Sequence, residues 1–297
     1  METLEILQRR IAISRGLQSI VRTMKTLSAV TIRRCEHASQ SVKSFDETVD
    51  LGLQVVLRDP TFAGMAIRAS EKAAVRGSIG IITVGSDHGL CGRYNNVVAE
   101  AALKEIESCL PEQVTLAAVG ARTADLLGGA DQLPSVIFAT PGSVTGISET
   151  TGAILSLIDD WHHDQGIERV RIVHNVQTSE NRARPVAMSL LPISPAYLRH
   201  QAERPWPSRR LPIYREERDT MLQRLLRQHV FVRVFRAIAE AQVSEHASRL
   251  SSMQAAERSI REHLSEMDAE YRMRRQEKIT TELLDVVAGA TVLGVGR

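Results

Sequence analysis

The sequence predicts an α/β protein with long helices, in which N- and C-terminal helices pair as an antiparallel coiled coil around an inserted α/β domain. Three observations predict it. The stretch from Ile213 to Ala288 holds neither proline nor glycine, which weaken a helix interior by about 3 and 1 kcal/mol. The N-terminal segment carries apolar residues at helical spacing. The segment between these two alternates short apolar runs with helical patterns.

The first segment, residues 1–60, is expected to form one helix of the coiled coil. Its apolar residues recur at spacings of four, three, four and three, at Ile13, Leu17, Ile20, Met24 and Leu27. This heptad-like stripe predicts the face that contacts a partner helix. A second stripe, offset from the first, is formed by Leu4, Leu7 and Ile11. Pro60 marks the expected end of the helix.

The second segment, residues 77–200, is expected to form the α/β domain. Short apolar runs predict buried strands at Ile79–Val84, Thr115–Val119, Val136–Ala139, Val170–Val176 and Val186–Leu191. Helical patterns lie between several of them, at Val97–Cys109, Arg122–Leu127 and Ser148–His162. Alternating strands and helices predict a mostly parallel, Rossmann-like sheet with helices packed on it. Residues 201–212 hold three prolines and are expected to form a linker.

The third segment, residues 213–293, is the proline- and glycine-free helix and its end. Its second half carries a narrow apolar stripe at Met253, Ala256, Ile260, Leu264, Met267 and Tyr271. Its first half is striped by Val230, Val234, Ile238 and Ala241, and Leu283, Val286 and Val287 continue near the end. A stripe this narrow buries one seam and needs a partner helix, for which the N-terminal helix is the candidate.

Composition and charge narrow the class of protein. Hydrophobic residues make up 43% and charged residues 24% of the chain, which suits a folded, soluble protein. No apolar run reaches the roughly 18 residues that a membrane span needs. The net charge of +2 is too balanced for a nucleic-acid coat protein, but eight basic residues face three acidic ones through residue 45. Such a basic face either is simply solvated or prefers an acidic partner.

The loop that follows the first predicted strand, Ser86–Asn96, is the main candidate for chemistry. Gly89 and Gly92 could cradle a phosphate, but the spacing of the known phosphate-binding motifs is missing, and tight turns explain both glycines. Cys91 could be a nucleophile beside Asp87 and His88. A reactive thiolate needs a cationic neighbour and access, and the sequence alone supplies neither. An enzyme that uses Cys91 therefore stays open as a second alternative.

Other candidate sites have simpler explanations. His162, His163 and Asp164 could bind a metal, but adjacent residues on a helix point in different directions, so a solvated helix end is expected. The basic cluster Arg272, Arg274, Arg275 and Lys278 has no interleaved aromatic residues and matches no nucleic-acid-binding module. The three cysteines form no CxxC pair. We expect no metal and no cofactor.

Four stretches resemble the gamma subunit family of F-type ATP synthases. Ile20–Arg34 is similar to the family's N-terminal basic stretch, and Gly89–Gly92 matches its GLCG turn. Ser244–Met253 matches its SE–AAR–M motif, and Arg275–Ala290 matches its RQ–IT–EL–GA ending. The resemblance covers nearly the whole chain in order, and the C-terminal motif is the specific one.

The resemblance implies a non-catalytic rotor shaft that couples ion-driven rotation of a c-ring to ATP synthesis or hydrolysis at beta subunits. The coiled coil would sit inside the ring of alpha and beta subunits, and the α/β domain would contact epsilon and the c-ring. The chain would be peripheral to the cytoplasmic face of a bacterial inner membrane. The residues that match the family's contacts with beta subunits are Met24, Lys25, Arg249, Gln276, Thr280 and Glu282.

Some positions depart from the family's pattern. Arg93 stands where the family usually has glycine, and His88 where it often has arginine. Such changes suggest a divergent bacterial form, and an alternative sodium-type ATPase is one expectation. The other function that remains open is a structural coiled-coil tether carrying an α/β module, unrelated to rotation.

Overall fold

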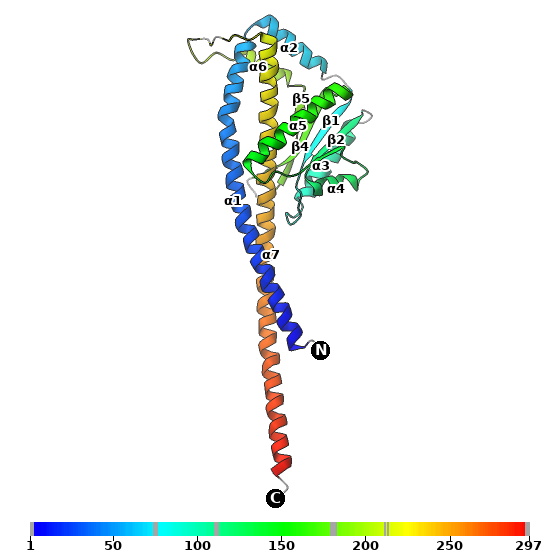
Figure 1. The fold of residues 1–297 in the computed structure, drawn as a ribbon, viewed down its shortest axis with the longest axis vertical. Helices are drawn as coiled ribbons and strands as arrows, with labels where there is room; N and C mark the ends of the chain where they lie inside the picture. The colour runs from blue at the N-terminus through cyan, green and yellow to red at the C-terminus, as the bar shows by residue number, and fades with distance from the viewer. Residues whose placement is uncertain are drawn as a thin grey trace. The chain divides into compact units, whose positions relative to one another are not determined.

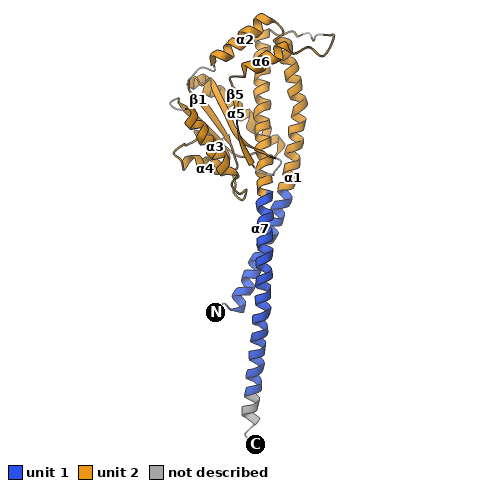
Figure 2. Ribbon diagram, turned by 180° about the vertical axis from the view of Figure 1, so that it is seen from behind, with its two compact units in different colours: residues 1–27, 250–297 blue, residues 28–249 orange. Residues whose placement is uncertain are grey.

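A computed structural model describes residues 3–73, 77–109, 113–178, 183–210, 212 and 214–294, with side chains as far as residue 288. Two long helices, α1 (Leu4–Val56) and α7 (Arg218–Gly294), come first and last along the chain, and the strands and shorter helices lie between them in the sequence (Figure 1). The chain divides into two compact units, residues 1–27 with 250–297 and residues 28–249 (Figure 2). Three predicted features lie at least partly outside the described residues: the start of the long helix at Ile213, the burial of Gly289 and Ala290, and the extreme tail.

The larger unit is built on a five-stranded sheet in the order β3-β2-β1-β4-β5. Its strands are β1 (Ile79–Val84), β2 (Val114–Val119), β3 (Val136–Phe138), β4 (Arg169–Gln177) and β5 (Ala183–Leu191). The first four are parallel to their neighbours, and β5 is antiparallel to β4. The predicted mostly parallel sheet is confirmed, and all five predicted strands are present with ends shifted by at most a few residues.

Helices cover both faces of this sheet. One face packs on α3 (Tyr94–Cys109) and α4 (Ala121–Gly128), burying residues such as Ile81, Val98 and Leu127. The other face packs on α5 (Val144–Gln165) and on the parts of α1 and α7 that belong to this unit, burying Ile82, Trp161 and Ile238 among others. Alternate residues of each strand therefore point into two separate cores, which explains why the strands read as continuous apolar runs.

Local sequence signals explain how α5 is placed. The Ser143 hydroxyl caps its first turn by accepting from the Gly146 amide at 3.0 Å, and Gly166 ends it with a left-handed φ of 63°. Trp161 of this helix lies over Gly80 of β1, where an added Cβ would come within 2.4 Å of the indole ring. Gly80 thus lets the largest fully buried side chain rest directly on the sheet.

Two helices were not predicted. Helix α1 ends at Val56, before Pro60, and Pro60 opens α2 (Pro60–Ala73). The Asp59 carboxylate caps α2 by accepting from the Thr61 and Phe62 amides, and proline is favoured in a first turn because it has no N–H to satisfy. Helix α6 (Pro195–Glu203) likewise begins at a proline and takes the first residues of the expected linker 201–212.

The smaller unit is a two-helix coiled coil of α1 and α7. Leu7 and Ile11 of α1 pack with Leu264 and Met267 of α7, and Ile260 and Tyr271 lie against this cluster. Arg15 pairs with Asp268 at 3.2 Å, and Arg22 pairs with Glu257 at 3.2 Å. Residue numbers rise along α1 as their partners' numbers fall along α7, so the helices are antiparallel, as predicted.

The seam of the coiled coil is not the one predicted on α1. The stripe assigned to it is exposed, with Ile13 at 55%, Leu17 at 48%, Ile20 at 57% and Leu27 at 61%. The second stripe, through Leu7 and Ile11, faces α7 instead, and it continues through Val21 and Ser28. Spacing identifies an apolar face but does not say which of two faces meets the helix of the same chain. The α7 seam of Met253, Leu264 and Met267 was predicted correctly.

The last part of α7 is exposed throughout. Residues 275–288 are all exposed, so the expectation that Leu283, Val286 and Val287 extend the buried seam is wrong. Their exposed fractions are 60%, 70% and 59%. The reason is length: α1 begins at Leu4, and its buried contacts reach only as far along α7 as Tyr271. Among the described helices, none has the combination of length and apolarity that crossing a membrane requires.

Candidate coupling site

The loop between β1 and α3 is organised by Asn95. Its side-chain oxygen accepts from the Ser86 amide at 3.1 Å, and the Ser86 and Thr123 hydroxyls both lie 3.0 Å from it. All three side chains are buried. A carboxamide that is satisfied by several donors in a low-dielectric core fixes the backbone around it. This network therefore holds the predicted candidate loop in one conformation.

Asp87 ties the same loop to two neighbouring connections. Its carboxylate accepts from the Ala121 amide at 2.9 Å, at the start of α4, and from the Thr140 amide at 2.8 Å, after β3. The carboxyl ends of parallel strands meet at one edge of a sheet, so one side chain can join three connections there. Gly120 permits the close approach, with a φ of 102° and Ser86 backbone atoms within 2.7 Å of a would-be Cβ.

The turn is also bound to α7 through a buried ion pair. Arg249 Nη2 lies 2.6 Å from Glu245 Oε1, and the two side chains are 9% and 6% exposed. The same guanidinium donates to the Gly89 carbonyl at 3.4 Å. Leu90, next in the chain, has a left-handed φ of 64° and is 61% exposed. Arg249 therefore supports an apolar residue that projects from the turn.

Cys91 lies beneath this turn and is not placed as a nucleophile. It is 1% exposed, and burial raises the pKa of its thiol, which outweighs the opposing effect of Arg249. A raised pKa keeps sulfur in its unreactive thiol form. His88 is exposed and contributes its backbone oxygen, not its ring, to the Ser86 hydroxyl at 2.8 Å. The arrangement favours a structural role for Cys91.

Further polar contacts between α7 and the sheet unit could not be predicted from the sequence. The Tyr94 hydroxyl donates to the Ala241 carbonyl at 2.9 Å, and His174 Nε2 lies 3.1 Å from Glu240 Oε2. Gln242 donates to the Pro141 carbonyl and lies 3.1 Å from the Cys35 sulfur of α1. These side chains come from segments far apart in the chain, so no spacing signals them. Together they fasten one stretch of α7 to the sheet domain.

A second polar group lies where α1, α6 and α7 meet in the larger unit. The Tyr197 hydroxyl donates to Asp50, lies 3.1 Å from His229 Nδ1, and its ring stacks on the imidazole at 4.4 Å. Asp46, Asp50 and His229 bring one ligand atom each within 4.8 Å and could hold a metal ion. Arg236 lies 3.8 Å from Asp46, however, and a guanidinium there opposes a second cation. We assign the group to structural hydrogen bonding.

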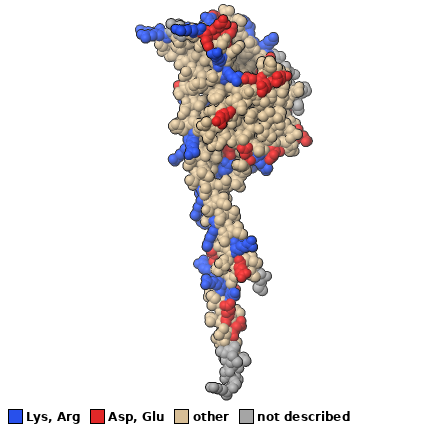
Figure 3. Space-filling view, in the orientation of Figure 1, with Lys and Arg blue, Asp and Glu red and all other residues tan. Residues whose placement is uncertain are grey.

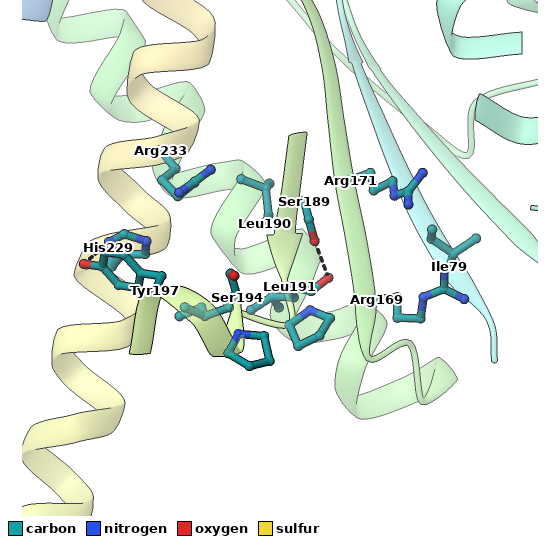
Figure 4. Close-up of a pocket in the computed structure, with 13 residues that line it drawn as sticks. Ile79, Arg169, Arg171, Ser189, Leu190, Leu191, Ser194, Tyr197, His229 and Arg233 are labelled. Atoms are coloured by element: carbon teal, nitrogen blue, oxygen red, sulfur yellow. Dashed lines mark hydrogen bonds between the residues drawn. The ribbon is translucent and has the colours of Figure 1, made fainter. Parts of the chain in front are cut away.

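A cavity of about 350 Å³ borders this group (Figure 4). Arg233, Tyr197 and His229 line one side of it, and Arg169 and Arg171 line the other, with Leu190 and Leu191 between them. Arg171 is bound to Glu105. Burial lowers the pKa of His229 to about 4, so its imidazole is neutral. The cationic groups do not converge on one point, and we assign no ligand to the cavity.

Two predicted contact residues, Met24 and Lys25, lie in the coiled-coil unit and are half-buried. Lys25 Nζ lies 2.5 Å from Glu257 Oε2. The remaining predicted residues of this unit, Gln276, Thr280 and Glu282, are exposed along the end of α7. The Thr280 hydroxyl donates to the Gln276 carbonyl at 2.9 Å, and Glu282 lies 3.7 Å from Lys278.

The other candidates from the sequence lie on the surface. His162, His163 and Asp164 are exposed at the end of α5, as expected of a solvated helix end. Arg93, one of the departures from the family's pattern, is 81% exposed and lies 3.5 Å from Glu100. Figure 3 shows acidic and basic side chains interspersed over the visible face.

Comparison with known sequences decides the family. The sequence model of the family described as ATP synthase matches residues 3–293. The chain belongs to this family, as a gamma chain. It is 27% identical over 304 residues to the ATP synthase gamma chain of Syntrophobacter fumaroxidans, covering 99% of each sequence. It is 26% identical to the gamma chain of Bdellovibrio bacteriovorus, again covering 99% of each.

Solved structures show that this gamma chain has the fold of ATP synthase central stalks. A chain of the Euglena gracilis mitochondrial ATP synthase rotor superposes with a TM-score of 0.61 at 15% identity, covering 93% of this chain and 98% of that chain. A chain from the Tetrahymena thermophila central stalk and c-ring gives 0.54 at 17% identity, covering 80% and 99%.

Proposed function

We propose that this gamma chain is the central rotor shaft of an F-type ATP synthase. It would couple ion-driven rotation of a c-ring to ATP synthesis or hydrolysis at beta subunits. The observation that carries the proposal is α7, a single helix of 77 residues whose first part is fastened to the sheet unit and whose second part pairs with α1. A continuous helix transmits torque because its backbone hydrogen bonds form one unbroken ladder.

The shaft would act through differential contact and not through chemistry of its own. Three beta subunits are equivalent until an asymmetric shaft favours a different conformation in each. The faces of the coiled coil supply such asymmetry: one side of α1 exposes Ile13, Leu17, Ile20 and Leu27, and the neighbouring sides carry arginines. Met24, Lys25, Gln276, Thr280 and Glu282 are the proposed direct contacts. Arg249 is buried, and its proposed part is to hold the turn at Leu90.

The proposed partners are the alpha and beta subunits, epsilon and the c-ring. Support comes from structural neighbours titled rotor, F1 with c-ring, and central stalk with c-ring. The chain would be peripheral to the membrane, and a bacterial relative set favours the cytoplasmic face of the inner membrane. That the coupling ion is sodium remains an expectation from the sequence, because the gamma chain does not contact the ion.

The test is assembly followed by uncoupling. The full chain, co-expressed with alpha and beta subunits, should purify as one complex with rotation-dependent ATP hydrolysis. Deleting residues 277–297 should leave the sheet unit folded, by circular dichroism, and the complex formed. In the whole enzyme with its c-ring, in membrane vesicles, the deletion should reduce ATP-driven ion pumping more than ATP hydrolysis. A chain that purifies with no ring subunit would refute the proposal and favour the coiled-coil tether. Hydrolase activity of the isolated chain that is lost in Cys91→Ser would instead support the enzyme alternative.

A further inference from the structure

The larger unit carries an apolar groove of about 760 Å³ that is lined by α1, α5 and α7. Phe231 and Phe235 of α7, whose rings stack at 6.3 Å, form part of its lining. Phe45 and Val30 of α1 are 44% and 43% exposed there, and Val144 of α5 is 40% exposed. Binding sites for small molecules are mostly clefts of roughly 300–1,000 Å³ with apolar and aromatic walls and a few polar groups. The groove has the size and the lining of such a site.

One end of the groove is cationic. Arg33, Arg34 and His37 line it, and no Asp or Glu is among the lining residues. Both arginines are exposed, and neither forms an ion pair with a residue in the described parts of the chain. A guanidinium group binds a carboxylate through two parallel hydrogen bonds. This end of the groove is therefore suited to a carboxylate.

The start of α5 lies at the same end. Gln242 of α7 donates to the Pro141 carbonyl, just before α5, and accepts from the Cys35 thiol of α1 at 3.1 Å. These two bonds place the first turn of α5 beside the cationic part of α1. Val144 and Ser148 of that helix line the groove. The amide groups of a first helical turn carry the positive end of the helix dipole, so α5 adds to the positive potential here.

The opposite end of the groove is aromatic. Phe45 lies about three turns further along α1 than Arg34, which is about 16 Å by the rise of a helix. Arg236 and Asp46, which directly follow Phe235 and Phe45 in the chain, lie 3.8 Å apart, so the two phenyl rings belong to the same end. Among the lining residues, charge is thus confined to one end, whereas apolar side chains line the whole length.

We propose that the groove binds a fatty acid, with its carboxylate at Arg33 and Arg34 and its hydrocarbon tail running past Val42 toward Phe45 and Phe231. A ligand with one anionic head and an apolar tail matches a groove that has charge at one end only. An amphipathic helix would carry charges along the whole length of its apolar face, and the groove offers them partners at one end alone. The site lies within the larger unit and does not depend on the rotor function.

The test is the binding of decanoate to the isolated full-length chain, by isothermal titration calorimetry, below the concentration at which decanoate forms micelles. One decanoate should bind per chain, and 1-decanol, which has the same tail and no charge, should bind more weakly. Acetate, which has the charge and no tail, should not bind, because burial of the tail supplies most of the binding free energy. The affinity for decanoate should fall as salt screens the arginines.

Variants of the two ends separate the head from the tail. Arg33→Gln with Arg34→Gln should weaken decanoate binding by about three- to tenfold and leave the binding of 1-decanol unchanged. Phe45→Gln should weaken the binding of both. All three positions are exposed, so the variants should keep the parental circular dichroism spectrum. The control is Arg209→Gln with Arg215→Gln, which removes two exposed charges elsewhere in the larger unit and should bind both ligands like the parent.

The proposal is overturned if decanoate does not bind saturably at one per chain, or if it binds no more tightly than 1-decanol. It is also overturned if the groove variants bind decanoate no more weakly than the control. A decanoate with a diazirine at its tail end should, on irradiation, label the chain near Phe45 or Phe231, and labelling confined to other parts of the chain would refute the site. A chain that binds no decanoate, and whose Phe45→Gln variant no longer assembles with alpha and beta subunits, would assign the groove to a protein partner instead.

Discussion

Glu257 of α7 and Lys25 of α1 join the two helices of the coiled coil, with Oε2 and Nζ 2.5 Å apart. The other carboxylate oxygen lies 3.2 Å from Arg22 Nε and 3.4 Å from Arg261 Nη2. One carboxylate thus gathers three cations from both helices. On α1 the buried residues that flank Arg22 and Lys25 in the sequence are Val21 and Ser28, and only the first of them is apolar. Charge sets the register of the helices where hydrophobic packing does not.

Glu257→Gln should therefore loosen the coiled coil without disturbing the sheet unit. Hydrogen bonds from Lys25, then Arg22, hold the pKa of Glu257 below its ordinary value. A carboxyl with a lowered folded-state pKa stabilises above its unfolded pKa and loses that effect as pH falls. The terminal helices of the parental chain should therefore become more sensitive to protease below about pH 4.3, which limited proteolysis measures.

The variant should show this increased proteolysis already at pH 7. Glu262→Gln, on an exposed position of α7, serves as the control and should behave like the parent. Equal proteolysis of parent and Glu257→Gln at pH 7 would show that the ion pairs contribute nothing.

Arg249→Ala should destabilise the larger unit by about 3–5 kcal/mol, because it leaves a buried carboxylate unpaired. Burial already raises the pKa of Glu245, and Arg249 counteracts that rise. Without the arginine the folded-state pKa rises further. The loss of unfolding free energy in Arg249→Ala should then be largest above this raised pKa. It should shrink as pH falls toward the pKa of Glu245 in the unfolded chain, because a protonated Glu245 carries no charge and is tolerated in the core.

Urea denaturation between pH 5 and 8 measures this dependence, and the double variant Glu245→Met with Arg249→Met supplies the comparison. It removes both charges and should be more stable than Arg249→Ala. If the double variant is less stable than Arg249→Ala, the Glu245–Arg249 ion pair stabilises the fold by more than the cancelling of its two buried charges.

The sequence predicted the strands, the sheet type and the α7 seam because each depends on a local period. Ile79–Val84 reads as a buried strand by itself, and Met253 to Met267 repeat at helical spacing. The face of α1 could not be predicted, because Ile13 and Ile11 belong to stripes of equal regularity. The hydrogen bonds between Arg249 and Gly89 and between Asp87 and Thr140 join residues that are distant in the chain. Only the fold brings them together, so neither period nor motif revealed them.

The stability of the larger unit should fall as pH decreases from about 6.5 to 4. His229 is 4% exposed, and burial, followed by Arg233, lowers its pKa to about 4. The unfolded chain binds a proton on this histidine near pH 6.5, whereas the folded chain does not until pH 4. Unfolding is therefore favoured progressively through this window, by up to about 3 kcal/mol for one such group.

His229→Gln should flatten the profile of unfolding free energy against pH, and His263→Gln, at an exposed position of α7, should not. His246, whose pKa burial also lowers to about 4, should account for part of the remaining slope. A profile that is identical in the parent and His229→Gln would show that His229 is accessible to protons in the folded state.

The exposed stripe on α1 should matter for coupling and not for folding of the isolated chain. Leu17→Gln with Leu27→Gln alters side chains that are 48% and 61% exposed, and surface substitutions usually change stability by no more than about 0.5 kcal/mol. Leu7→Ala removes a side chain that is 0% exposed in the seam and should cost about 2–5 kcal/mol. Thermal unfolding of the isolated chain compares the two.

In the assembled complex, Leu17→Gln with Leu27→Gln should impair function more than Leu7→Ala does, if the exposed stripe faces the ring. A polar stripe would lose apolar contact in some orientations of the shaft more than in others, so ATP-driven pumping should fall while the complex still forms. Arg9→Gln with Arg10→Gln, at exposed positions of the same helix, controls for any general effect of altering α1. Unchanged pumping in Leu17→Gln with Leu27→Gln would place the working contact on another face, through Met24 or the end of α7.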